Sequence, residues 1–215
     1  MSFLIFLLAA LPVCLFLRAI WEPTHLDENE IWLDDPQIGQ TSAESVIRVL
    51  LFSDLHIEFM RIKRDFLLTA ISRAKPDLVL FAGDLTNHEE HLPAALALMR
   101  DIRQLPALDG RPCIAVAGNH DSQKALRDLK KTGWSVLSNQ GITCSIRGRL
   151  WQIIGLEDLQ RGRPRVIKSV LRASGAGIPR ERRLILAHNP DCLFLVDEDQ
   201  AAYFCSGHFH GGQFW

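Results

Sequence analysis

The sequence predicts an α/β fold, in which buried parallel strands alternate with helices and a functional site lies at the carboxyl ends of the strands. Short continuous apolar runs, typical of strands buried on both faces, alternate with segments whose apolar residues recur at helical spacing. Polar residues, many of them Asp and His, follow the apolar runs directly. Because the carboxyl ends of parallel strands meet at one edge of a sheet, we expect an α/β sandwich with its site at that edge.

The first segment, residues 1–21, is expected to be a membrane anchor. Residues 3–17 carry no charge, and residues 19–21 extend the apolar stretch past Arg18 to about the length that a tilted transmembrane helix needs. Neither a basic residue before the stretch nor a small-x-small cleavage site after it is clear, so a retained anchor is favoured over a signal peptide. Arg18 on the C-terminal flank favours a cytoplasmic location for the rest of the chain.

Residues 22–45 are expected to form a linker. They mix prolines and a glycine with acidic residues, and leave room for one short strand around residues 31–33. The remaining chain, residues 46–215, has the length of one domain.

The elements of this domain follow from its apolar patterning. We expect strands at residues 46–53, 78–82, 113–117, 184–187 and 201–205, and a β-hairpin over residues 142–154 that turns at Gly148. Helical spacing predicts helices over residues 62–71, 92–102 and 166–173. Pro76 ends the first of these helices.

Overall composition narrows the possible classes. The chain has 24 Lys and Arg against 25 Asp and Glu, which argues against a strong general affinity for nucleic acid. The five cysteines are scattered and never in CxxC spacing, which argues against a disulfide framework or a zinc ribbon. Any charged binding surface must therefore be local.

Five short motifs of polar residues stand at the ends of five expected strands. Each alone is more often a turn than a site, but together they form an ordered set of potential metal ligands. The set is DxH (Asp54, His56), GD (Asp84), GNHD (Asn119, His120, Asp121), AH (His188) and GHxH (His208, His210).

Mixed carboxylate and imidazole ligands suit Mn²⁺, Fe²⁺ or Zn²⁺. Two such ions about 3.5 to 4 Å apart need a bridging carboxylate and can activate a shared water. Asp84 is our choice for the bridge, and Mn²⁺ is the first choice of metal.

In order and spacing these motifs resemble the calcineurin-like metallophosphoesterase family, from about residue 46 to residue 213. The resemblance implies a two-metal phosphoester hydrolase. It implies one ion held by Asp54, His56, Asp84 and His210 and another held by Asp84, Asn119, His188 and His208. It also implies that His120 acts beside the scissile phosphate and that Asp121 orients its ring.

Within the family, the apolar N-terminus followed by this motif set resembles the bacterial membrane-associated branch. That branch includes enzymes that cleave the pyrophosphate of UDP-2,3-diacylglucosamine in lipid A synthesis. We therefore expect a phosphorylated, lipid-linked substrate, an inner-membrane location and no nucleic acid partner; protein partners are not indicated. The alternatives are a general phosphodiesterase and, less favoured, a non-catalytic scaffold with the same fold.

Two features bear on the substrate and on completeness. Arginines crowd residues 161–183, and suit a solvated face or anionic lipid headgroups better than nucleic acid. Members of the family commonly continue beyond GGQ, so either the sheet lacks an edge or the chain is a C-terminally truncated copy.

Overall fold

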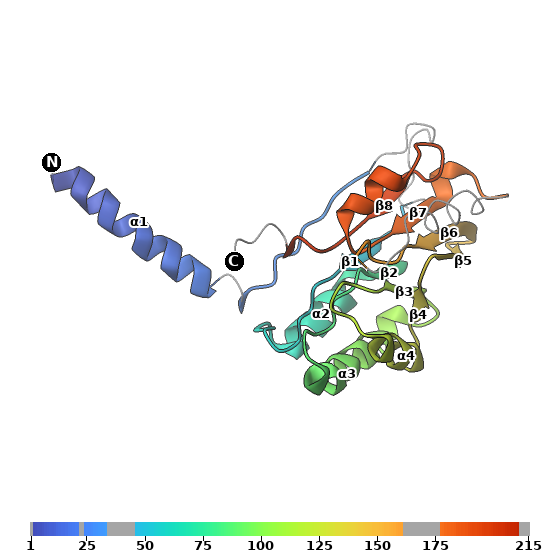
Figure 1. Ribbon diagram of the computed structural model, residues 1–215, viewed down its shortest axis with the longest axis horizontal. Coiled ribbons are helices and arrows are strands. Elements are labelled where there is room, and N and C mark those ends of the chain that lie inside the picture. The colour runs from blue at the N-terminus through green and yellow to red at the C-terminus, as the bar shows by residue number, and fades with distance from the viewer. Residues whose placement is uncertain (1, 22–23, 34–45, 161–176, 211–215) are drawn as a thin grey trace.

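Two four-stranded sheets pack face to face, as Figure 1 shows. The computed structural model describes residues 2–21, 24–33, 46–160 and 177–210. The expected helix at residues 166–173 lies outside these ranges. Within the described residues the two sheets, one of them parallel, and the helices that cover it confirm the expected mixed α/β fold with a parallel sheet.

The first sheet is parallel throughout, in the order β1-β2-β3-β4. Its strands are β1 (Val49–Phe52), β2 (Leu78–Phe81), β3 (Cys113–Val116) and β4 (Ser135–Leu137). Helices α2 (Arg64–Ala74), α3 (Leu92–Arg103) and α4 (Gln123–Lys131) lie on its outer side (Figure 1). Short 3₁₀ turns η3 (Glu89–His91) and η4 (Pro106–Leu108) flank α3.

The second sheet has the order β5-β6-β7-β8. Its strands are β5 (Gln140–Ile146), β6 (Arg149–Gly155), β7 (Arg183–Leu186) and β8 (Tyr203–Cys205). The expected hairpin is β5–β6, and Arg147 and Gly148 both have positive φ, as a tight hairpin turn requires. The 3₁₀ turns η5 (Arg180–Arg182) and η6 (Pro190–Leu195) flank β7.

Alternate residues of the central strands explain why their sequences are apolar throughout. In β2, Val79 and Phe81 pack with the helices, whereas Leu78 and Leu80 join the core between the sheets. All four are almost completely buried. Burial of both faces is what a continuous apolar run predicts, so the interpretation of residues 78–82 is confirmed.

The same interpretation is wrong for β1. Among the described strands β1 stands at one end of its sheet, and Val49 and Leu51 remain 42% and 40% exposed. Both pair in register with fully buried residues of β2, Leu78 and Leu80, so they lie on the inner face of the sheet beyond the cover of the second sheet. An apolar run therefore did not reveal that this strand stands at an edge.

Two elements were not expected. Helix α4 is mostly charged and buries only Ala125, Leu126 and Leu129, and Ser122 caps it by accepting a hydrogen bond from the Ala125 N–H at 3.1 Å. Strand β4 has three residues, too few to give a pattern. The expected short strand at residues 31–33 is not found: these residues are described without secondary structure and are at least 67% exposed.

Residues 2–21 form helix α1 (Ser2–Trp21), which projects away from the sandwich in Figure 1. Most of its described apolar side chains are exposed, among them Leu11, Phe16 and Trp21. Within the part of the chain that the structure describes, no helix has both the length and the apolar character for a membrane crossing. The expected transmembrane anchor is therefore not supported.

Candidate metal centre

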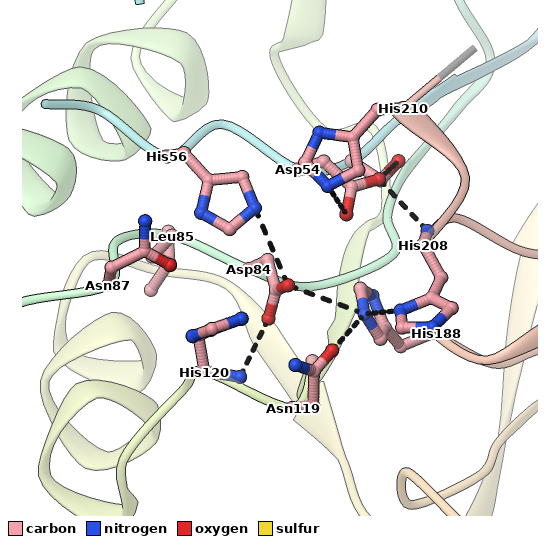
Figure 2. Close-up of polar contacts among 12 residues, drawn as sticks. Asp54, His56, Asp84, Leu85, Asn87, Asn119, His120, His188, His208 and His210 are labelled. Carbon is pink, nitrogen blue, oxygen red and sulfur yellow. Dashed lines mark hydrogen bonds and ion pairs between the residues drawn. The ribbon is translucent and has the colours of Figure 1, made fainter. Parts of the chain in front are cut away.

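Five strands deliver their following residues to one place, at the carboxyl edge shared by the two sheets. Strands β1, β2 and β3 of the first sheet lead to Asp54, Asp84 and Asn119, and β7 and β8 of the second lead to His188 and His208. Figure 2 shows these side chains converging with those of His56 and His210. The structure thus brings together all seven residues that the sequence analysis chose as ligands.

Asp84 lies at the centre of this cluster and is 1% exposed. Its Oδ1 accepts a hydrogen bond from the His120 backbone N–H at 2.9 Å. Its Oδ2 is 3.6 Å from Nε2 of His56 and 3.4 Å from Nε2 of His188 (Figure 2). One carboxylate oxygen therefore faces imidazoles from two different sides.

The buried ring of His188 has a defined tautomer when it is neutral. Its Nδ1 lies 2.7 Å from the Ala82 carbonyl oxygen, which can only accept, so Nδ1 carries the proton. The lone pair of Nε2 then points toward Asn119 Oδ1 at 2.9 Å, His208 Nδ1 at 3.1 Å and Asp84 Oδ2. So many electron-rich atoms repel one another unless a proton or a cation lies among them.

Asp54 joins the two halves of the cluster. Its Oδ2 accepts hydrogen bonds from the Ser53 hydroxyl and, at 3.0 Å, from the His208 N–H. Its Oδ1 lies 3.6 Å from His210 Nε2 and, within the described chain, is buried without a hydrogen-bond partner. Nδ1 of His56 is likewise buried and unpartnered there, and the rings of His56 and His210 stack at 4.9 Å.

These orphaned atoms fit a metal centre. Two groups of side chains could each hold an ion, and within each group the ligand atoms all lie within 4.8 Å of one another. One group is Asp54, His56 and His210, and the other is Asp54, Asp84 and His188. Burial lowers the pKa of His56, and Asp84 partly opposes this shift. A lowered pKa keeps the imidazole neutral, the form that binds metals. The donor set therefore suits borderline divalent cations.

Backbone strain is concentrated at the same residues. Asp54, His56, Asp84, His208 and His210 all have positive φ, which non-glycine residues rarely adopt. Gly118 meets a different requirement, because a Cβ there would lie 2.1 Å from Asp84 Oδ1. Strain of this kind persists where the surroundings hold it, and it gathers at functional sites.

Asp121 lies between two of the loops that carry proposed ligands. Its carboxylate, 1% exposed, accepts backbone hydrogen bonds from Asp84 and Gly118 at Oδ2 and from Leu85 at Oδ1, each at 2.9 Å. Burial raises its pKa, partly offset by these hydrogen bonds. These contacts hold together two of the loops that carry ligands. That Asp121 also orients the ring of His120 stays a prediction.

His120 itself is exposed and lies edge-on to His56 at 5.4 Å between ring centroids. A small cavity of about 20 Å³ lies beside it, lined in part by Asn87 and Ser122. The sequence did not indicate that Glu58 holds two of the residues that line this cavity, Thr86 and Asn87. Glu58 accepts hydrogen bonds from the Thr86 hydroxyl at 2.9 Å and from the Asn87 N–H at 2.7 Å, and no motif pointed to it.

Comparison with known proteins is consistent with this geometry. Residues 47–212 match the model of the family described as calcineurin-like phosphoesterase. The chain is 26% identical to the uncharacterized metallophosphoesterase YkoQ of Bacillus subtilis, over 80% of this chain and 63% of the relative. It is 30% identical to the phosphodiesterase YaeI of Escherichia coli, over 77% and 61%. It is 29% identical to the uncharacterized metallophosphoesterase YkuE of B. subtilis, over 77% and 59%. The chain thus spans less than two thirds of the length of these relatives.

Proposed function

Because the chain belongs to the calcineurin-like phosphoesterase family, we propose that it hydrolyses a phosphodiester or pyrophosphate bond with the help of two divalent metal ions. The observation that carries the proposal is the position of Asp84 Oδ2 between His56 and His188. A single oxygen there suits the bridge that a pair of ions requires.

The proposed ligands form two sets that share Asp84. Asp54, His56, Asp84 and His210 would hold one ion, and Asp84, Asn119, His188 and His208 the other. When bound, the ions supply Lewis-acid activation of the phosphoryl group and of a water. Mn²⁺ is the proposed metal, with Fe²⁺ and Zn²⁺ as alternatives.

Proton transfer and the positioning of the ligands are assigned to His120 and Asp121. His120 is exposed beside the cluster and reaches it from the loop whose backbone binds Asp84 Oδ1. In the proposal it donates a proton to the leaving oxygen. Asp121 contributes by fixing the loops of Asp84 and Gly118, so that the two ligand sets keep their spacing.

A finer proposal concerns the substrate. The exposed apolar side chains of α1 suit contact with lipid, and a lipid-linked pyrophosphate such as UDP-2,3-diacylglucosamine suits an enzyme that works at a membrane surface. A general phosphodiesterase acting on soluble diesters is the alternative, favoured by the name of the relative YaeI.

Activity and metal content measured together test the proposal. The full-length chain, loaded with Mn²⁺, is expected to hydrolyse bis(p-nitrophenyl) phosphate and to lose this activity after treatment with a chelator. Lipid-linked pyrophosphates in detergent micelles, assayed beside soluble diesters, separate the two substrate classes. A metal-free and inactive protein would instead favour a scaffold.

A further inference from the structure

The loop that follows Asp84 holds a polar side chain in a fixed position beside the candidate metal centre. Glu58 accepts one hydrogen bond from the Asn87 backbone N–H and another from the Thr86 hydroxyl, which also lies 3.0 Å from the His88 carbonyl oxygen. The backbone around Asn87 is thus pinned from both sides. Loops fixed in this way hold a side chain ready for a ligand with little loss of entropy on binding.

The carboxamide of Asn87 makes no hydrogen bond to any other residue that the structure describes. The side chain is half-buried. Figure 2 shows Asn87 on the same side of Asp84 as His56 and His120, away from His188 and His208. The amide is not among the buried unpartnered atoms of the described chain, so it is open to solvent and can bind a ligand without first breaking a hydrogen bond within the protein.

Asn87 and His120 line the same cavity, whose volume is about 20 Å³. A site for one water needs about 10–15 Å³ measured in this way, so the cavity has room for a single oxygen-sized group. The charged residues that line it, Glu89 and Asp121, are both acidic, and no lysine or arginine is among its described lining residues. Glu58 adds a further carboxylate behind Asn87. The negative charge around the cavity therefore favours a singly charged ligand over a doubly charged one.

We propose that Asn87 is a substrate-binding residue, whose amide N–H donates a hydrogen bond to a non-bridging phosphoryl oxygen, and that this neutral donor selects singly charged phosphodiesters over doubly charged phosphomonoesters. The inference rests on the proposed function. It adds to that function a residue and a charge class of substrate.

Two variants of Asn87 test the inference in the metal-loaded full-length protein. The probes are bis(p-nitrophenyl) phosphate, a monoanion, and p-nitrophenyl phosphate, a dianion at pH 8. Asn87→Ala is expected to lower kcat/KM for the diester by about tenfold or more, the effect of losing one hydrogen bond to a charged group. Asn87→Asp is expected to lower monoester hydrolysis more than diester hydrolysis, because its carboxylate repels the dianion more strongly.

Glu90→Gln provides the matched control. Glu90 is exposed in the same loop and does not line the cavity, so its substitution is expected to leave both rates unchanged. Metal content and the thermal unfolding temperature of each variant are measured in parallel. A role confined to substrate predicts that both quantities stay at their wild-type values.

Several results would overturn the inference. These are unchanged diester hydrolysis in Asn87→Ala, an unchanged or lower diester-to-monoester ratio in Asn87→Asp, higher activity in Asn87→Asp, and loss of metal or of folding in either variant. Each of these leaves the proposed function standing if the wild-type protein hydrolyses the diester with metal. A wild-type protein that is inactive, whether it binds metal or not, would remove that function itself.

Discussion

Asp84 holds its place because its two carboxylate oxygens have different neighbours. The His120 N–H fixes Oδ1, and this leaves Oδ2 to face His56 and His188. The Asp84→Asn variant keeps the shape of the side chain but removes its charge. We expect it to lose metal and with it hydrolytic activity, as measured by elemental analysis and diester assay. Full metal content with normal turnover would show that Asp84 is not the bridge.

His120 should behave differently, since its ring is not among the proposed ligands. We expect His120→Ala to retain both ions and to lose activity by about 10² to 10⁴-fold, the usual contribution of a general acid. A substrate with a good leaving group needs less protonation and should lose less. Equal losses on substrates with good and poor leaving groups would argue against proton donation.

Metal-ligand residue types at the ends of expected strands were predictable. Residues whose role depends on contacts between distant loops were not. Asp54, His188 and His210 are recognisable because carboxylates and imidazoles follow expected strands. The backbone contacts of Asp121 could not be foreseen, because two of its partners, the N–H groups of Asp84 and Leu85, lie 37 and 36 residues away in the sequence. Glu58 escaped notice for the same reason, since its contacts with residues 86 and 87 depend on the fold.

At the scale of elements, the GD loop after β2 and the GNHD loop after β3 are joined by Asp121. Asp121→Ala would leave three buried backbone N–H groups without this acceptor, and each such loss costs about 1–3 kcal/mol. We expect a fall in the free energy of unfolding of several kcal/mol, measured by urea denaturation of the metal-free protein.

The Asp121→Asn variant serves as the control, because its amide oxygen can still accept from one side. Its loss of stability should be smaller than that of Asp121→Ala. If both variants are as stable as the wild-type protein, Asp121 does not hold the two loops together.

Elements with strong patterning were predictable, and those at the margins were not. Strands β2 and β3 are buried on both faces, and their continuous apolar sequences predict this burial. Strand β1 has an equally apolar sequence but stands at the edge, since strand order is a property of tertiary packing. Helix α4 was missed because its buried face has only three residues.

At the scale of the molecule, thiol chemistry reports on the packing. Burial raises the pKa of Cys113 and Cys205 to about 11 and that of Cys192 to about 12. At pH 8 roughly one thiol in a thousand or fewer is then ionised. We expect iodoacetamide to label exposed Cys14 first in the folded protein and all five cysteines after denaturation. Labelling of Cys113 as fast as Cys14 would contradict the described core.

We propose that two cations gather side chains more than 150 positions apart in the sequence. Asp54 and His208, which are joined by a hydrogen bond, are one such pair. Anomalous diffraction from a crystal of the Mn²⁺-loaded protein measures this directly. We predict two manganese peaks about 3.5 to 4 Å apart, one on each side of Asp84 Oδ2. A single peak, or peaks away from Asp84, would contradict the account.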